Sequence, residues 1–520
     1  MIKKLTKSKT LPVIFMVSTI LSAICFRAAR QNWVFITSGF GFDLPFILFM
    51  GMIICAILFG AVLVFKLHDS EIVNKKAYKI LLVIATFFAF FLSVFGLIHT
   101  IFYAMDENLE VFTLCLAKTL KEGALLLIVP FFALFFPKFP CKVKKAVAAV
   151  SVLAVLLFGL NAYYPLTPYK MTSEPMVIDN GTEYSIVFST NDKGSAYVEY
   201  TYEGKDYKVF DNSCGRLITD KIHSIPVPYE HLRNNTYTVS STRVMEDFSY
   251  GSRRGKTVTS DEYEFRYNDT YDQTWLVISD WHTKLDTAYA AIANLESEFD
   301  GVMLVGDSSP GVDFQEQIIT NTVEFGGKVS GGTKPVLYVR GNHETRGAFA
   351  DELPVYLGID QLYYTADVGP YSFVVLDSGE DKLDSHIEYG GMTNYDTYRA
   401  NMIEWLKGVE VENEKVIAIS HAWQISTVEP ELSQAGWAEL DRLGARLIIS
   451  GHEHSCRFIG TNEGYEQEVK EKYPDIIGYL DGGKSGDNYI ASMLTLTENG
   501  FEIKTVNNLD EEILNEEFSW

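Results

Sequence analysis

Hydrophobic and polar positions divide this chain of 520 residues into three regions. The first 163 residues are dominated by uncharged runs of 17, 22, 26, 15 and 24 residues, the last of which continues to position 169. A helix of about 20 apolar residues spans the hydrocarbon core of a bilayer. We therefore expect an α-helical, five-span membrane region over residues 1–163, in which the segment before the short fourth run lengthens that helix.

Short alternating runs follow at residues 172–267. Segments such as YSIVFST and AYVEYTY alternate apolar and polar positions, and they are separated by clusters of Asn, Asp and Gly. A period of two is typical of strands with one buried face, and Asn, Asp and Gly favour turns. The pattern predicts a fibronectin-III-like β-sandwich, which we interpret as a spacer or packing platform.

From Thr274 onward, apolar runs alternate with helical segments. The runs WLVIS, GVMLV, PVLYV, YSFVVL, KVIAIS and ARLIIS are interspersed with segments such as NYDTYRANMIEWLKGV. Such alternation is typical of an α/β domain with buried, largely parallel strands. We assign this domain to residues 270–508, and we interpret the acidic tail LDEEILNEEFSW as a solvated end.

Charge separates the first region from the other two. Residues 1–163 carry 16 Lys and Arg against 7 Asp and Glu, whereas the remainder carries 28 against 60. With five spans, 12 lysines fall on one side, and the positive-inside bias places that side in the cytoplasm. We expect an integral membrane protein with a cytoplasmic N-terminus and an extracytoplasmic catalytic domain. The acidic outer part argues against a nucleic-acid partner.

Polar residues able to bind a metal follow five of the six apolar runs of the α/β region. They are Asp280 and His282, then Asp307, then Asn342, His343 and Glu344, then His421, and finally His452 and His454. Residues two apart on an extended segment point to the same side, so each Asp/His or His/His pair can face one ion. Because chemistry in such sheets gathers at the carboxyl ends of strands, we expect a metal site there.

The ordered motifs DWH, GD, GNHE, a lone His and GHEH resemble the signature of the calcineurin-like metallophosphoesterases. The resemblance covers residues 274 to about 505 and implies an α/β sheet sandwich flanked by helices. A β-sandwich followed by such a domain also resembles the layout of purple acid phosphatases. Those enzymes carry a tyrosine three residues after the aspartate of the second motif, where this chain has Pro310, so no iron-tyrosinate colour is expected.

Carried over residue by residue, the family pattern implies two metal ions that share one ligand. The first would be held by Asp280, His282, Asp307 and His454, and the second by Asp307, Asn342, His421 and His452. The implied activity is hydrolysis of phosphate mono- or diesters by a metal-bridging hydroxide. His343 would protonate the leaving oxygen, unless it is a third ligand or a core residue, and Glu344 would orient its imidazole and raise its pKa. Divalent or trivalent Mn, Fe or Zn suits these N and O ligands.

Two further residues are candidates for substrate binding. Arg346 follows the GNHE motif and could contact phosphate or lie at the surface. His386 lies in residues 377–391, which could cover the pocket or form a solvated loop. We expect a phosphorylated small molecule or an envelope or lipid-linked substrate. An alternative of another class stays open, a non-catalytic sensor or transport-associated protein whose exterior domain binds phosphorylated ligands.

Overall fold

The computed structural model describes residue 142 and residues 167–248, 251–483 and 488–520. The predicted five-span region 1–163 lies outside these residues except for position 142. Within the described ranges, no helix is long and apolar enough to cross a membrane. The chain divides into two units, Met1–Pro168 with Val244–Gly255 and Tyr169–Arg243 with Lys256–Trp520. The second unit contains every candidate site residue and is described below.

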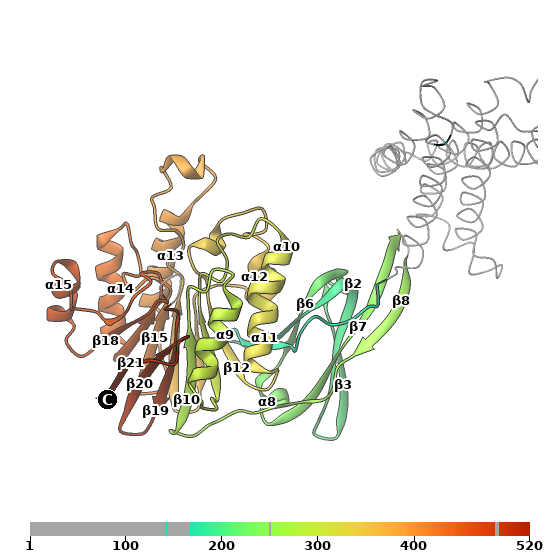
Figure 1. Ribbon diagram of the computed structural model, residues 1–520, viewed down its shortest axis with the longest axis horizontal. Helices are drawn as coiled ribbons and strands as arrows, with labels where there is room; N and C mark the ends of the chain where they lie inside the picture. Colours follow the sequence, from blue (N-terminus) through green and yellow to red (C-terminus); the bar gives the residue numbers. More distant parts are fainter. Residues whose placement is uncertain (1–141, 143–166, 249–250, 484–487) are drawn as a thin grey trace, which may run out of the picture. The chain divides into compact units, whose positions relative to one another are not determined.

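One layer of this unit belongs to a sheet of 13 strands (Figure 1). The strands follow the order β21-β20-β19-β10-β11-β12-β1-β2-β7-β8, and β3, β6 and β9 pair beside this path. Its strands in the α/β region are β10 (Gln273–Ile278), β11 (Gly301–Val305), β12 (Pro335–Val339), β19 (Ile490–Leu496), β20 (Gly500–Asn507) and β21 (Glu512–Ser519). The strands β10, β11 and β12 are parallel neighbours, and all residues of β11 and β12 are buried, as in sheets covered on both faces.

A second sheet of six strands follows the order β13-β14-β15-β16-β18-β17. Its strands are β13 (Tyr364–Val368), β14 (Tyr371–Leu376), β15 (Lys415–Ser420), β16 (Ala445–Ser450), β17 (Cys456–Phe458) and β18 (Ile477–Asp481). Neighbours from β14 to β18 along this order are parallel. All six apolar runs of the α/β region are therefore strands, as predicted.

The two sheets pack face to face. Along β14, Phe373 and Val375 lie in one core with Leu276 of the first sheet, whereas Val374 and Leu376 lie in a second core with the helices. Side chains of a strand point alternately to opposite faces, so this partition confirms the predicted sheet sandwich.

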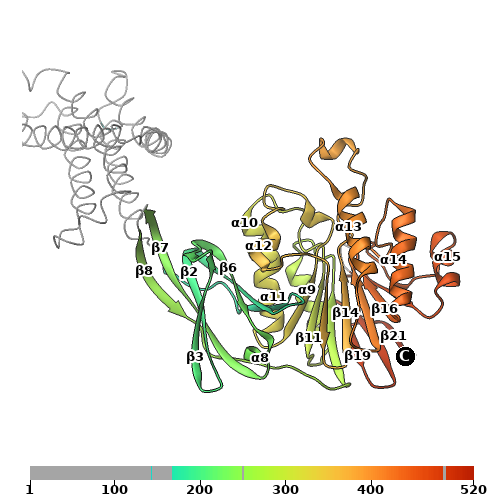
Figure 2. The same cartoon turned by 180° about the vertical axis from the view of Figure 1, so that it is seen from behind.

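Helices cover the outer faces of both sheets (Figures 1 and 2). The helices are α9 (Leu285–Asn294), α10 (Gln315–Ile318), α11 (Glu324–Ser330), α12 (Leu353–Leu357), α13 (Tyr395–Lys407), α14 (Pro430–Arg442) and α15 (Tyr465–Lys472). The π-helical turn Ile319–Val323 joins α10 to α11, and 3-10 turns occupy His343–Thr345 and Ile387–Tyr389. Helices α9 and α11 contact the first sheet, and α13 and α14 pack on the second.

Antiparallel strands fill most of the segment predicted to be a β-sandwich. They are β1 (Met176–Asp179), β2 (Tyr184–Tyr202), β3 (Lys205–Phe210), β4 (Asn212–Ser213), β5 (Arg216–Leu217), β6 (Asp220–Val227), β7 (Asn235–Phe248), β8 (Gly251–Thr259) and β9 (Tyr263–Phe265), with the short helix α8 (Tyr229–Leu232) between β6 and β7. Strand β1 pairs antiparallel with β2 and parallel with β12, so hydrogen bonds run without a break from these strands into the α/β sheet. The fibronectin type III assignment stays a prediction. Cys214 and Cys456 are both free.

The acidic tail is a strand of the sheet, and its acidic side chains are exposed, as expected of a solvated end. Strand β21 pairs antiparallel with β20, and Trp520 Nε1 donates to the carbonyl of Thr497 at 2.7 Å. Leu514, Phe518 and Trp520 pack against the core, while the acidic side chains between them face solvent. Strand pairing and these three apolar residues outweigh the charge of an edge strand exposed on one face.

Candidate metal centre

The strand ends of both sheets deliver the predicted ligand residues to one place. Asp280 and His282 follow β10 and Asp307 follows β11 in the first sheet, whereas His421 follows β15 and His452 follows β16 in the second. Hydrogen bonds join these loops across the sheets, because the N–H of His452 donates to Asp280 Oδ2 at 2.9 Å. The carboxyl ends of the parallel strands thus meet, as predicted for an α/β sheet.

Three overlapping groups of side chains could hold a metal ion. They are Asp280, His282 and His454; His282, Asp307 and His343; and Asp307, His421 and His452. Within each group, one ligand atom per residue lies within 4.8 Å of the others. The amide oxygen of Asn342 lies 3.1 Å from His452 Nδ1, so Asn342 joins the third group. All seven predicted ligands, together with His343, are therefore brought together.

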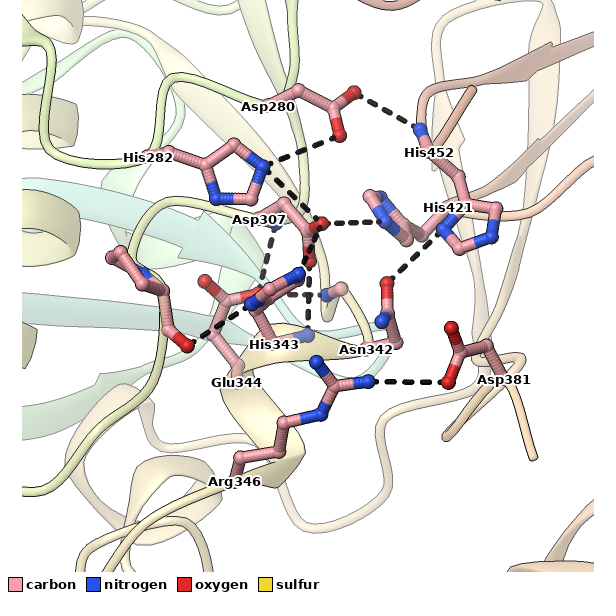
Figure 3. Close-up of polar contacts among 12 residues, drawn as sticks. Asp280, His282, Asp307, Asn342, His343, Glu344, Arg346, Asp381, His421 and His452 are labelled. Carbon is pink, nitrogen blue, oxygen red and sulfur yellow. Dashed lines mark hydrogen bonds and ion pairs between the residues drawn. The ribbon is translucent and has the colours of Figure 1, made fainter. Parts of the chain in front are cut away.

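Asp307 belongs to the second and third groups and also lies close to His282 of the first group. Its Oδ2 atom is 3.3 Å from His421 Nε2, 3.6 Å from His282 Nε2 and 3.9 Å from His343 Nε2. On the far side of His282, the Oδ1 atom of Asp280 is 4.0 Å from His282 Nε2 and 3.7 Å from His454 Nε2. Figure 3 shows Asp307 with contacts to histidines on both sides.

Two buried atoms of this cluster have no hydrogen-bond partner among the described residues. These atoms are Asp280 Oδ1 and His421 Nε2. A buried polar atom without a partner costs about 1–3 kcal/mol, and such atoms need an explanation. Both belong to residues that face the other ligand atoms, and both are of the types that bind transition metals. The residues present therefore fit metal ions.

Hydrogen bonds at Nδ1 direct the histidine Nε2 atoms toward this point. His421 Nδ1 donates to the carbonyl of Val305 at 2.7 Å, and His454 Nδ1 donates to the carbonyl of Gly483 at 3.0 Å. A carbonyl partner at one ring nitrogen fixes the tautomer and leaves the other nitrogen free to coordinate.

Burial and mutual charge shift the titration of these groups. Burial lowers the pKa of His282 and of His452 to about 4, which keeps both rings neutral and able to coordinate. Burial also raises the pKa of Asp280 to about 6. Burial would lower the pKa of His421, but the carboxylate of Asp307 outweighs it and raises that pKa to about 10. The protein places negative charge here that either a proton or a metal cation can neutralise.

Backbone strain concentrates on the same residues. The φ angles of Asp280, His282, Asp307, His452 and His454 are 54°, 37°, 56°, 69° and 48°, in the left-handed region that residues other than glycine rarely adopt. Each such residue costs on the order of 1–3 kcal/mol, and strain of this kind clusters at functional sites. The surrounding fold holds these five side chains in fixed directions.

Glycines make room for the loops at two close approaches. A Cβ atom at Gly341 would lie 2.2 Å from Asp307 Oδ1 and 2.3 Å from Asp307 N. A Cβ atom at Gly451 would lie 2.5 Å from Asp280 Oδ2. Only a residue without a Cβ permits these contacts.

His343 lies at the rim of the centre. Its backbone N–H donates to Asp307 Oδ1 at 3.0 Å, and its Nδ1 donates to the carbonyl of Pro310 at 3.0 Å. The side chain is 30% exposed, unlike that of His421, which is fully buried. The accessible position is consistent with contact to a bound substrate.

Glu344 does not orient the imidazole of His343, contrary to the prediction. Its carboxylate is fully buried and accepts hydrogen bonds from the N–H groups of Asp307, Gly341 and Ser309 at 2.9, 3.0 and 3.1 Å. The hydroxyl of Ser308 donates to it at 2.8 Å. Glu344 therefore holds the loop that carries Asp307, and the Pro310 carbonyl takes the orienting position at His343.

The two candidate substrate residues lie on different parts of the structure. Arg346 lies near the centre, where its Nη2 donates to Asp381 at 3.1 Å (Figure 3). Its Nε and Nη2 also donate to Glu380 at 2.5 and 2.8 Å. His386 accepts a hydrogen bond from the N–H of Glu388 at 3.3 Å, and its ring is tilted by 59° to the ring of Tyr389, with the centroids 6.0 Å apart. Among the described contacts, none joins His386 to the ligand cluster.

Residues that support the GHEH loop could not be assigned from the sequence. Glu453 Oε1 accepts from Trp423 Nε1 at 2.6 Å and from Gln424 Nε2 at 3.2 Å. Arg457 Nη2 donates to Glu453 at 2.5 Å and to Glu466 at 2.6 Å. The position of Glu453 inside the motif was the only signal, because Trp423 and Gln424 come from a distant segment of the chain.

A family model matches the part of the chain that carries the metal centre. Residues 274–456 match the family of calcineurin-like phosphoesterases. This match confirms a metal-dependent phosphoric ester hydrolase, the enzyme class that the motifs implied. No curated protein matches the sequence.

Several solved structures are similar in part. A structure of PhoD is 10% identical, with a TM-score of 0.43, over 68% of this chain and 90% of that one. GAP50, described as the anchor in the inner membrane complex of Plasmodium, is 16% identical, with a TM-score of 0.35, over 48% of this chain and 89% of its own. A cold-active protein-tyrosine phosphatase of a psychrophilic Shewanella species is 12% identical, with a TM-score of 0.24, over 68% and 99%.

Proposed function

We propose that this chain is a membrane-anchored, outward-facing dimetal phosphoesterase that hydrolyses phosphate mono- or diesters. The observation that carries the proposal is the position of Asp307. Its Oδ2 atom lies 3.3 Å from His421, a member of the third group of possible ligands, and 3.6 Å from His282, a member of the first. A carboxylate in this position can serve two cations at once, as two-metal phosphoesterases require.

The proposed ligand sets follow the two outer groups. Asp280, His282, Asp307 and His454 would hold one ion, and Asp307, Asn342, His421 and His452 the other. Nitrogen and oxygen ligands without sulfur suit Mn, Fe or Zn. When bound, the ions would supply an activated water as nucleophile and neutralise charge on the phosphoryl group.

Charge at the centre favours a phosphate ester. Two carboxylates, Asp280 and Asp307, face two cations, so the site would carry a net positive charge of about 2 with divalent ions. The acidic surface elsewhere has little effect, because charges are screened over roughly 8–10 Å at physiological salt. A phosphate ester is thus attracted despite the net charge of −23 on the whole chain.

The chain itself supplies proton transfer and positioning. The Pro310 carbonyl occupies His343 Nδ1, so Nε2 is the atom that would pass a proton to the leaving oxygen. Arg346 donates to Glu380 and Asp381 through Nε and Nη2, and no described residue accepts from Nη1, which would contact a phosphoryl oxygen. His386 is proposed to contact a leaving group from the loop beside Arg346.

The proposed location rests on the sequence. Five long uncharged runs in residues 1–163 and the excess of lysines on one side support a cytoplasmic N-terminus and an extracytoplasmic catalytic domain. The substrate would be a phosphorylated small molecule or an envelope or lipid-linked phosphoester.

Hydrolysis by the full chain in detergent tests the proposal. The assay measures release of p-nitrophenol from p-nitrophenyl phosphate and its bis ester with Mn²⁺, together with metal content. We expect Asp307→Asn to lose bound metal and at least about a hundredfold in rate. This loss exceeds the one caused by replacing residues that only support the ligands of a metal. Asp313→Asn, at an exposed carboxylate nearby, is the matched control and should keep its rate. Equal rates for wild type and Asp307→Asn would reject catalysis and leave a binding role.

A further inference from the structure

Three of the four most exposed large apolar side chains of the described residues lie on segments that hydrogen bonds join to the Arg346 side of the metal centre, and the fourth, Val355, lies on helix α12. Ile387 is 90% exposed, Met392 88%, Val355 68% and Phe314 66%. Single exposed apolar residues are ordinary, but a concentration of them on one part of a surface is typical of an interaction site.

Two of these side chains lie on a projecting loop, residues 383–394, which we call the arm. The arm leaves the body after Asp381 and returns at the start of α13, where the Asp384 carboxylate accepts from the N–H groups of Tyr395 and Asp396 at 2.8 and 3.1 Å. Figures 1 and 2 show this loop projecting beyond α13, at the end of the sheets where α10 lies. Its tip is exposed, because Ile387 and Met392 have little protein around them.

Hydrogen bonds tie the arm to the metal centre. Tyr389 OH donates to Glu380 Oε2 at 2.7 Å, and Glu380 in turn binds Arg346, three residues after His343. On the other side, the N–H of Val312 donates to the Arg346 carbonyl at 2.7 Å, and exposed Phe314 follows two residues later. Hydrogen bonds therefore connect both segments that carry these apolar side chains to the Arg346 side of the centre.

Charge on the arm excludes several kinds of partner. Lys382 directly precedes the arm and forms ion pairs with Asp381 at 2.9 Å and with Glu388 at 3.4 Å. The arm therefore carries no surplus of positive charge. A surface that binds a polyanion or an anionic lipid headgroup would need such a surplus. The partner that fits is apolar and uncharged.

The sequence of residues 1–163 favours a lipid bilayer as this apolar partner. The five uncharged runs in residues 1–163 would hold the protein at a bilayer, and a bilayer interface accepts large aliphatic and aromatic side chains without any charge. We propose that Ile387, Met392 and Phe314 insert into the lipid interface and turn the metal centre toward phosphoesters at the membrane surface. This inference rests on the proposed membrane-anchored phosphoesterase function.

Fluorescence quenching in full-length protein tests the docking. Ile387→Trp is reconstituted in phosphatidylcholine vesicles with or without brominated acyl chains, and the emission of the wild type is subtracted. We expect brominated lipid to quench at least half of the added emission, also in high salt. Leu217→Trp is the matched control, since Leu217 is an exposed apolar residue on β5, outside the arm, and its added emission should stay unquenched.

Three readouts separate the possible failures. Flotation with the vesicles reports anchoring, p-nitrophenyl phosphate hydrolysis reports catalysis, and quenching reports docking. A protein that floats and hydrolyses the ester, but whose residue 387 is quenched no more than residue 217, would overturn the docking alone. Quenching without hydrolysis would sustain the docking and reject the catalytic proposal. A protein that does not float would overturn both anchoring and docking.

Discussion

Replacing Glu344 by Gln tests how the loop that carries Asp307 is held. The Glu344 carboxylate is fully buried and accepts four hydrogen bonds, two at each oxygen. An amide of the same shape keeps one acceptor oxygen and turns the other position into a donor. The substitution therefore removes charge and acceptor capacity without leaving a cavity.

The geometry determines which hydrogen bond is lost. One oxygen accepts from two backbone N–H groups, those of Asp307 and Gly341, whereas the other accepts from Ser309 N–H and the Ser308 hydroxyl. The amide nitrogen takes the second position, because the Ser308 hydroxyl can rotate and become an acceptor. Ser309 N–H is then buried without a partner, which costs about 1–3 kcal/mol.

The assay is the thermal unfolding midpoint of the full chain in detergent with Mn²⁺. At roughly 2–4 °C for each kcal/mol, we expect the midpoint of Glu344→Gln to fall by about 5 °C. Glu463→Gln, at an exposed glutamate, carries the same chemical change and should leave the midpoint unaltered. The pH dependence of kcat/KM for p-nitrophenyl phosphate is measured on the same samples.

The pH profile distinguishes this account from a direct action on His343. If Glu344 raised the pKa of the His343 imidazolium, a neutral Gln would move the basic limb of the profile to lower pH. We expect no such movement, because His343 Nδ1 donates to the Pro310 carbonyl. A shift of about half a pH unit or more, with an unchanged midpoint, would refute the loop-holding role.

Three further predictions concern other parts of the unit. Gly341→Ala should lose bound Mn²⁺ and at least about tenfold in rate, because its Cβ would lie 2.2 Å from Asp307 Oδ1; metal analysis and ester hydrolysis measure both losses. Gly408→Ala is the control, because its Cβ would lie 3.4 Å from its nearest neighbour. Equal losses in both variants would contradict this explanation. Burial raises the pKa of Asp179 to about 6 from 3.8, so the stabilisation by its bound proton is complete below about pH 4 and lost as the pH rises through 6. Between pH 4 and pH 8, the free energy of unfolding of Asp179→Asn should therefore rise by about 3 kcal/mol relative to that of the wild type, as measured by unfolding midpoints. A difference that does not change with pH would contradict the raised pKa of Asp179. Phe518→Ala should lower the free energy of unfolding by about 1–2 kcal/mol, seen as a lower unfolding midpoint, because the side chain is partly buried against the core. An unchanged midpoint would mean that this side chain of β21 does not stabilise the fold.

Local patterns in the sequence predicted the α/β part closely. The six apolar runs are strands because each is long enough to be buried on both faces and is bounded by polar or turn residues. The ligand residues were also readable, since each follows such a run within a few positions. Local patterns predicted neither the pairing of the acidic tail, strand β21, with β20 nor the pairing of β1 with the distant strand β12.

The sequence by itself determined which side chains meet at the candidate metal centre, because strand ends and motif spacing are local properties. Only the tertiary structure decided how they are supported. Glu344 stands next to His343 in the chain, yet its carboxylate turns to the Asp307 loop, and a carbonyl 33 residues away holds the imidazole. The sequence also did not predict that the apolar residues of the arm are exposed, because Ile and Met are residue types that are usually buried. Hydrogen-bond partners and exposure depend on the fold of the whole unit, which places segments far apart in sequence side by side.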